Sequence, residues 1–262
     1  MKVDIPLYDG AEAKSKFEYV LCNFHSQEIT GLDICIRKQL VVTCSKDRSV
    51  KIWNYVTKNL ELSYMLQQDA HAVAFHPSGF HVIVAEPDKI YLMNVLSKNL
   101  NPFKSIQLKH CFEIQFSNGG HLFAATQATN NVVQVYNFYT NESPAHYIHK
   151  GHVGKVKCID WFDDDMGFAS TGISGEVYLW DFVNLKDGQN RIDEFTKRNV
   201  QMSSVVNIPG RFCEAYCCGS DGNIWNIKDP QNPYEAGAVM SQLQITHNAK
   251  ALFAGVGEKL KE

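Results

Sequence analysis

The stretch LVVTCSKDRSVKIWN, from Leu40 to Asn54, contains two β-rich runs separated by a polar turn. The second run alternates apolar and polar residues, which is typical of a strand with two different faces. Two such runs around a short polar turn predict an antiparallel β-hairpin. The turn contains Asp47, and the hairpin ends in a large side chain, Trp53.

The same arrangement recurs along the chain. Three further copies have a β-rich run, a polar turn, a second run and a large residue before Asn or Asp: HVIVAEPDKIYLMN (His81 to Asn94), HLFAATQATNNVVQVYN (His121 to Asn137) and GFASTGISGEVYLWD (Gly167 to Asp181). The large residues are Trp53, Met93, Tyr136 and Trp180, at intervals of 40, 43 and 44 residues. A period of about 40–45 residues is that of one blade of a β-propeller.

A fifth copy, FCEAYCCGSDGNIWNIKD, runs from Phe212 to Asp229 and allows two registers. Spacing from Trp180 favours Trp225 as the large residue at the hairpin end. Alignment on the Asp-Gly turn at Asp221 places Ile227 there instead. We expect the turn register, because a turn fixes strand pairing, whereas an aromatic residue can lie on either face.

A further strand precedes each hairpin, in the segments Ile29 to Arg37, Ala72 to Gly79, Phe112 to Gly120 and Val156 to Asp165. Outer strands are expected near Phe17 to Cys22, Leu60 to Gln67, Phe103 to Leu108 and Ala145 to His149. The predicted fold class is therefore all-β: a β-propeller with four-stranded antiparallel blades.

The predicted domains are an N-terminal segment, residues 1–16, and a propeller over residues 17–258. The propeller comprises five full repeats and a partial sixth, Ser241 to Glu258, after which the sequence reaches GEKLKE before any third strand. We expect an incomplete seven-bladed ring, short by about one repeat and a strand.

Composition excludes several classes of function. The 262 residues carry a net charge of −3, which gives no excess of positive charge for nucleic acid. No apolar run is long enough for a membrane helix, and the first residues lack the apolar stretch of a signal peptide. The eight cysteines lack the spacing of a disulfide framework and are expected to be reduced. A cytoplasmic protein without membrane or nucleic-acid partners is predicted.

The combination of His25, Asp47 and Trp53 is typical of a WD repeat, as is Gly151-His152 with Trp180-Asp181. The stretches FHSQEITGLDICIRKQLVVTCSKDRSVKIWNY, FHPSGFHVIVAEPDKIYLMNVL and FSNGGHLFAA resemble the cilia- and flagella-associated protein 57 family of WD-repeat proteins. The resemblance implies tandem propellers, a long coiled coil and a place on axonemal doublet microtubules near inner dynein arms and the regulatory complex. Since a first propeller and a coiled coil are missing, the chain is expected to be a fragment, an incomplete gene model or a short paralogue.

His25, Thr43 or Ser45, Asp47 and Trp53 contain the residue types of a hydrolase, because His, Asp and a hydroxyl can relay a proton. In a WD blade the same residues form a structural hydrogen-bonded network, which is the interpretation we favour. Such blade networks are expected at His25, Thr43, Asp47, Trp53, His152, Ser170, Trp180 and Asp221. Ser174 stands where Asp47 would fall, so the network around His152 is expected to be incomplete.

No catalytic, cofactor or metal site is predicted. Three groups contain the residue types of a zinc site: His71, His76 and His81; His146, His149 and His152; and Cys213, Cys217 and Cys218. Asp163, Asp164 and Asp165 contain the carboxylates of a calcium site. In each case strand alternation or a solvated turn explains the residues without an ion.

The sequence predicts a non-catalytic scaffold, because a propeller presents loops on a rigid ring. The family resemblance implies that this scaffold is an axonemal subunit of motile cilia. Such a subunit would help anchor inner dynein arms and the regulatory complex on doublet microtubules. Its partners are other proteins, with no small-molecule substrate. The alternative is a recognition subunit of a non-ciliary complex such as a ubiquitin ligase.

Overall fold

A computed structural model describes residues 24–140, 148–182, 191–256 and 259–261. Within these ranges the chain is built from β-strands, and its single helical segment is the short 3₁₀ turn η1 (Ile36–Lys38). No helix in the described ranges is long and apolar enough to cross a membrane. The predicted strand from Phe17 to Cys22 and the N-terminal segment 1–16 lie outside the described residues.

The strands form consecutive antiparallel sheets, each assembled in chain order. Sheet 1 contains β1 (Ile29–Cys35), β2 (Leu40–Ser45), β3 (Ser49–Asn54) and β4 (Asn59–Met65). Sheet 2 contains β5 (Ala72–Phe75), β6 (His81–Ala85), β7 (Lys89–Val95) and β8 (Leu100–Gln107). Sheet 3 contains β9 (Ile114–Phe116), β10 (Leu122–Gln127), β11 (Val132–Asn137) and β12 (Ile148–His149).

Sheet 4 contains β13 (Val156–Trp161), β14 (Gly167–Gly172), β15 (Glu176–Asp181) and β16 (Arg191–Thr196). Sheet 5 contains β17 (Met202–Asn207), β18 (Ala215–Gly219), β19 (Asn223–Asn226) and β20 (Tyr234–Glu235). Sheet 6 contains β21 (Met240–Ile245), β22 (Leu252–Val256) and β23 (Lys259–Lys261). The expectation that the sequence ends before a third strand of this sheet is wrong, because β23 pairs with β22 within the GEKLKE segment.

The large residues that end the first four hairpins occupy equivalent positions. Each pairs with the second residue of the first strand of its hairpin, in the pairs Val41–Trp53, Val82–Met93, Phe123–Tyr136 and Phe168–Trp180. In the fifth hairpin Cys217 pairs with Trp225, just as Thr43 pairs with Lys51 in the first. The turn register is therefore confirmed, and Ile227 takes the position of Trp53.

Both faces of the inner strands are buried, because neighbouring sheets pack face to face. In β5, Val73 and Phe75 join the core between sheets 1 and 2, while Ala72 and Ala74 join the core between sheets 2 and 3. Further apolar clusters fill the spaces between each later pair of sheets. This two-sided burial explains why strands such as β6 are apolar at almost every position.

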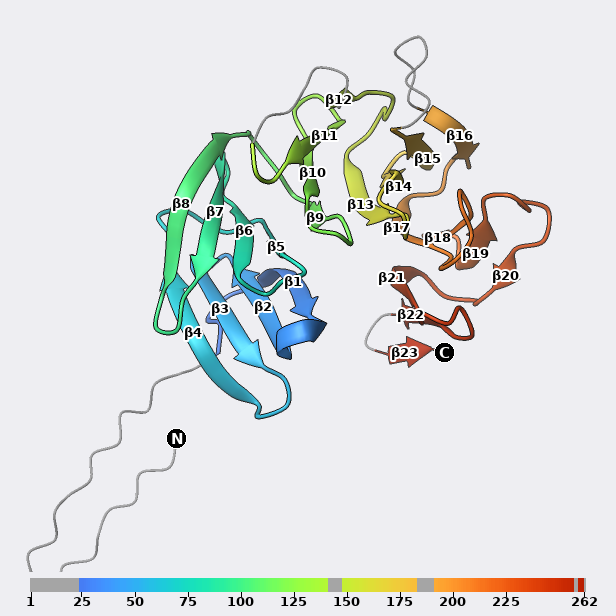
Figure 1. The fold of residues 1–262 in the computed structure, drawn as a ribbon. Coiled ribbons are helices and arrows are strands. Elements are labelled where there is room, and N and C mark those ends of the chain that lie inside the picture. The colour runs from blue at the N-terminus through green and yellow to red at the C-terminus, as the bar shows by residue number, and fades with distance from the viewer. Residues whose placement is uncertain (1–23, 141–147, 183–190, 257–258, 262) are drawn as a thin grey trace, which may run out of the picture.

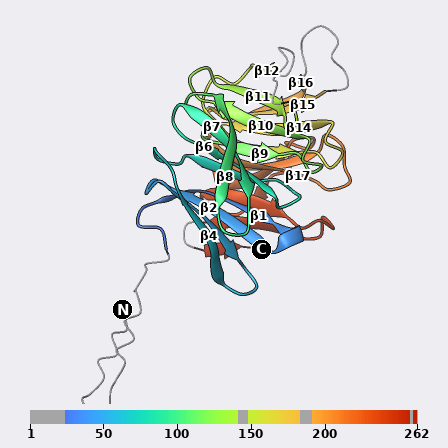
Figure 2. The ribbon, with the colours of Figure 1, turned by 60° about the vertical axis from the view of Figure 1, so that its left-hand side comes forward.

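The six sheets follow one another along an arc, with their innermost strands toward a common axis (Figure 1). Seen from the side, the strands of successive sheets lie in stacked layers (Figure 2). The innermost strands β1, β5, β9, β13, β17 and β21 line an axial cavity of about 720 Å³. Together with the repeats in the sequence, this arrangement identifies a WD-type β-propeller with five four-stranded blades and a partial sixth.

Candidate functional site

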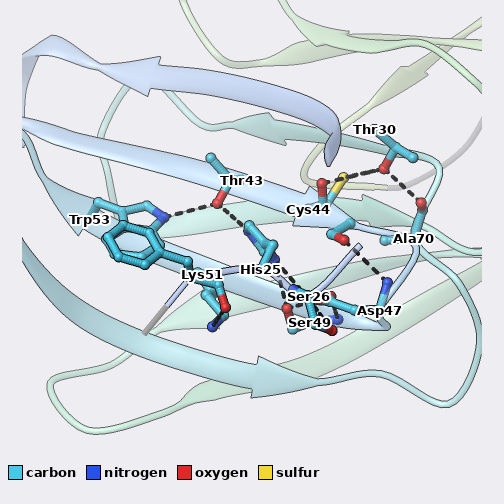
Figure 3. A network of polar contacts seen from close by, with 12 residues as sticks. His25, Ser26, Thr30, Thr43, Cys44, Asp47, Ser49, Lys51, Trp53 and Ala70 are labelled. Carbon is cyan, nitrogen blue, oxygen red and sulfur yellow. Dashed lines mark hydrogen bonds and ion pairs between the residues drawn. The ribbon is translucent and has the colours of Figure 1, made fainter. Parts of the chain in front are cut away.

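The polar network of the first blade joins His25, Thr43, Asp47, Ser49 and Trp53 (Figure 3). The indole Nε1 of Trp53 donates to Thr43 Oγ1 at 2.9 Å, and Thr43 Oγ1 lies 2.7 Å from His25 Nε2. On the other side of the ring, His25 Nδ1 lies 2.8 Å from Ser49 Oγ, which donates to Asp47 Oδ1 at 2.6 Å. The network thus connects the end of β3 to the turn between β2 and β3.

Proton counting fixes the tautomer of His25. Ser49 uses its single hydroxyl proton on Asp47, so it accepts a proton from His25 Nδ1. Burial lowers the pKa of His25 below its usual value, against the raising effect of Asp47, which favours the neutral ring. His25 Nε2 is therefore an acceptor for the hydroxyl of Thr43. Thr43 is buried, as is the ring of His25, so the set offers no exposed nucleophile.

Asp47 remains a carboxylate in this network. Burial alone would raise its pKa, but hydrogen bonds from the Ser49 side chain and from the backbone N–H groups of Ser26 and Ser49 lower it strongly. The bond from Ser26 N, at 2.8 Å, ties the segment before β1 to the hairpin turn. The arrangement stabilises a turn and holds a loop, and it leaves no group free to transfer a proton to a substrate.

The fourth blade contains the same tryptophan–hydroxyl–histidine hydrogen bonds, with Ser170 in place of Thr43. Trp180 Nε1 donates to Ser170 Oγ at 2.7 Å, and His152 Nε2 lies 2.7 Å from the same oxygen. Burial lowers the pKa of His152 to about 3, so its ring is neutral. The structure thus brings together His152, Ser170 and Trp180.

The expectation that this fourth network is incomplete is confirmed, because His152 Nδ1 has no hydrogen-bond partner among the described residues. Ser174 holds the turn position of Asp47, but Glu176 lies two residues later, at the position of Ser49. Its longer side chain reaches back, so that Oε2 lies 3.9 Å from His152 Nδ1 and Oε1 accepts the N–H of Val153 at 3.4 Å. Glu176 therefore takes over the bond by which Asp47 holds the loop before the innermost strand, but no hydrogen bond joins it to His152.

The backbone just before the innermost strand is held in the same way in five blades. In each, a side chain at or beside the hairpin turn accepts a backbone N–H from that segment. The accepting residues are Asp47, Glu86, Thr126, Glu176 and Ser220. Glu86, Thr126, Glu176 and Ser220 were missed in the sequence, although their shared place near the hairpin turn marks them.

Asp221, in the fifth blade, has a different local role. Its carboxylate accepts the indole N–H of Trp225 at 2.8 Å and the N–H of Asn223 at 3.3 Å, all within one hairpin. Cys217 and Ile227 occupy the places of Thr43 and Trp53, so an apolar pair replaces the hydroxyl–indole bond. The structure therefore does not join Asp221 to a histidine network.

The histidines of the first candidate zinc group make contacts with other protein groups, and the rings of His76 and His81 lie edge to face at 5.5 Å. His71 stacks on Phe112, His76 Nε2 lies 3.0 Å from Gly120 O, and His81 Nδ1 lies 2.9 Å from Asn94 Oδ1. Among the described residues, no group of three His, Cys, Asp or Glu side chains could share an ion. His146 lies outside the described residues.

Aspartates and hydroxyls connect neighbouring blades. Phe75 N donates to Asp33 Oδ2, Asn207 N to Asp160 Oδ2 and Gly210 N to Asp163 Oδ2, each at 2.6 Å. Thr30 Oγ1 donates to Ala70 O, and Ser203 Oγ donates to Met240 O, each at 2.7 Å.

Asp165 accepts the N–H groups of Asn118 and Gly119. The aspartates considered for calcium thus bind backbone: Asp163 and Asp165 across blade boundaries, Asp164 within its own turn.

Three carboxyl groups line the axial cavity, on Asp33, Glu113 and Asp160, beside Lys157. Burial raises the pKa of Asp33, raises that of Asp160 to about 6 and raises that of Glu113 to about 8. Asp33 and Asp160 accept backbone N–H groups of the next blade, so they serve as blade connectors. No enzyme-like pairing of an acid with a nucleophile occurs in this part of the described structure.

The comparisons with known proteins agree with this architecture. The family model described as WD domain, G-beta repeat matches residues 16–54 and 144–181, which include the two histidine networks. Cilia- and flagella-associated protein 57 A of Tetrahymena thermophila is 46% identical over 197 residues, which cover 75% of this chain and 14% of that protein. Cilia- and flagella-associated protein 57 of Mus musculus is 40% identical over 242 residues, which cover 91% of this chain and 19% of that protein.

A more distant relative, echinoderm microtubule-associated protein-like 4 of Xenopus laevis, is 26% identical over 160 residues, or 60% of this chain and 17% of that protein. The chain therefore spans less than a fifth of the length of these curated relatives. Its identity to the ciliary proteins extends across most of its own length. The chain is a WD-repeat homologue of the cilia- and flagella-associated protein 57 family.

Proposed function

We propose that this chain is a non-catalytic scaffold of the axoneme of motile cilia or flagella. In this role its propeller helps anchor inner dynein arms and the regulatory complex on doublet microtubules. The observation that carries the proposal is 40–46% identity to proteins named for cilia and flagella, over 75–91% of the chain.

The chemistry of the blades supports a scaffold. The histidines that resemble catalytic groups are neutral and hydrogen-bonded within the hairpins, because burial lowers the pKa of His25 and His152. Burial also raises the pKa of the thiols of Cys111 and Cys158 to about 12, which makes them poor nucleophiles at neutral pH. These polar groups stabilise the blades, and binding is left to the loops.

Proximity labelling in motile ciliated cells tests the proposal. The chain is expressed as a fusion to a biotin ligase, with the ligase alone, targeted to cilia, as the control. We expect the fusion to remain with detergent-extracted axonemes and to label inner dynein arm and regulatory-complex subunits above the control. A fusion that is extracted with detergent and labels ubiquitin-ligase subunits would refute the axonemal role and favour the alternative.

A further inference from the structure

Four loops at one end of blades 1 and 2 form a continuous surface. They are residues 36–39, 55–58, 77–80 and 96–99, which connect β1 to β2, β3 to β4, β5 to β6 and β7 to β8. Because successive strands are antiparallel, these four connections lie at the same end of their sheets. We call residues 36–39, 55–58, 77–80 and 96–99 the basic loop surface.

Direct contacts hold the four loops together. Tyr55 N donates to Gln39 O at 3.1 Å, and Val95 N donates to Phe80 O at 2.7 Å. The Nζ atom of Lys38 lies 3.2 Å from the centroid of the Phe80 ring, which joins the loops of the two blades. The loops are therefore arranged as one surface before any partner binds.

This surface combines apolar side chains with positive charge. Five large apolar residues are exposed on it, with relative exposures from 42% to 80%: Ile36, Tyr55, Val56, Phe80 and Leu96. The four loops also carry four basic residues and no acidic residue: Arg37, Lys38, Lys58 and Lys98. Neighbouring apolar and cationic groups on preformed loops are typical of a protein interface.

Charge is separated between the two ends of the same blades. The loops at the opposite end, residues 24–28, 46–48, 66–71 and 86–88, contain five acidic residues and two basic ones. Several of the acids there are engaged in holding loops, among them Asp47 and Glu86. The four loops of the basic loop surface therefore present positive charge without an acid of their own, and charge complementarity selects an acidic partner.

We propose that the basic loop surface docks this propeller on the acidic surface of a microtubule. The inference rests on the proposed ciliary function, in which the microtubule is the acidic protein polymer that an axonemal subunit meets. Arg37, Lys58 and Lys98 provide the attraction and orientation, while Val56 and Leu96 provide apolar contact once water is excluded. No covalent step is involved.

Co-sedimentation of the complete chain with stabilised microtubules, at increasing NaCl concentrations, measures this interaction. Charge reversal in the double variant Arg37→Glu and Lys98→Glu is expected to weaken binding by about tenfold or more and to reduce its salt dependence. The matched control is Arg48→Glu, in the turn after β2, with Lys109→Glu, in the loop after β8. It makes the same charge change at the opposite end of the blades and is expected to alter binding by less than about twofold.

A second double variant, Val56→Ser and Leu96→Ser, tests the apolar part. Both side chains are more than half exposed, so melting temperature should be preserved while binding falls about threefold or more. Removal of the acidic C-terminal tails of tubulin with subtilisin should weaken binding of the unmodified chain and leave the charge-reversed variant nearly unaffected.

Three results would overturn the proposal. One is absence of binding of the unmodified chain to microtubules, and another is equal loss of binding in the Arg37/Lys98 variant and the Arg48/Lys109 control. The third is stronger binding to vesicles containing phosphatidylserine than to microtubules, lost in the same charge-reversed variant, which would make a membrane the occupant. None of these results decides axonemal incorporation, which the proximity-labelling experiment measures separately.

Discussion

Replacement of Ser170 by alanine should destabilise the fourth blade more than a typical loss of one hydroxyl. The Ser170 hydroxyl is fully buried and is the hydrogen-bond partner of both Trp180 Nε1 and His152 Nε2, each at 2.7 Å. Its removal leaves two buried polar groups unpaired, and each such group costs about 1–3 kcal/mol. The expected loss in the free energy of unfolding is therefore about 2–6 kcal/mol.

A double-mutant cycle separates the hydrogen bond from packing. Trp180→Phe removes the indole donor, so the double variant Ser170→Ala and Trp180→Phe should lose less stability than the sum of the two single variants. We expect a coupling energy of about 1–3 kcal/mol, because the unpaired indole N–H is absent from the double variant. Urea unfolding followed by far-ultraviolet circular dichroism gives each free energy without relying on tryptophan fluorescence.

The matched comparison is Cys217→Ser in the fifth blade, at the same hairpin position. There Ile227 replaces the tryptophan, so the new hydroxyl finds no indole donor and should destabilise rather than stabilise the blade. Strictly additive single-variant costs, or a Ser170→Ala cost below about 0.5 kcal/mol, would show that the hydroxyl–indole bond does not hold the blade together.

Three other predictions concern pH, packing and thiols. Burial lowers the pKa of both His149 and His152 to about 3, so these side chains bind a proton more readily in the unfolded chain than in the folded one. The free energy of unfolding should therefore be highest above about pH 6.5. It should fall below that pH, by about 2 kcal/mol per histidine at pH 5. His149→Phe should reduce this pH dependence of the melting temperature, and an unchanged profile would contradict it. Gly172→Ala should lower the melting temperature, because an added Cβ would lie 2.5 Å from Glu176 Oε2 and 2.7 Å from His152 Nδ1. The double variant Gly172→Ala and Glu176→Ala should recover part of the lost melting temperature. No recovery would argue against this contact. Maleimide at pH 7.5 should modify the fully buried Cys111 only after denaturation, as peptide mass spectrometry can show, because burial raises the pKa of its thiol to about 12. Rapid labelling of Cys111 in the folded chain would refute its burial.

The sequence was sufficient to predict the hairpins and their register. Trp53, Met93, Tyr136 and Trp180 follow a nearly constant period, and the Asp-Gly turn correctly placed Ile227 rather than Trp225 at the hairpin end. Both predictions depend on local geometry, because turn length and strand alternation fix which residues pair.

Side chains that act over a longer reach could not be predicted in this way. Glu176 accepts a loop N–H, as Asp47 does in the first blade, although Glu176 stands at the position of Ser49, and only the length of its side chain makes this possible. Thr126 and Ser220 hold their loops with hydroxyl groups, and only their place near the hairpin turn distinguishes them from the many other hydroxyl residues. The strand β23 was missed because its three residues are too few to show a period.

The connections between blades also bear on how such repeats diverge. Asp33, Asp160 and Asp163 bind backbone N–H groups of the next blade, while Thr30 and Ser203 bind backbone carbonyls. Since nearly every residue supplies these backbone groups, one repeat can keep its connection whatever side chains its neighbour acquires. Substitutions in adjacent repeats therefore need not occur in concert, and each blade is free to acquire its own loop chemistry while the ring keeps its geometry.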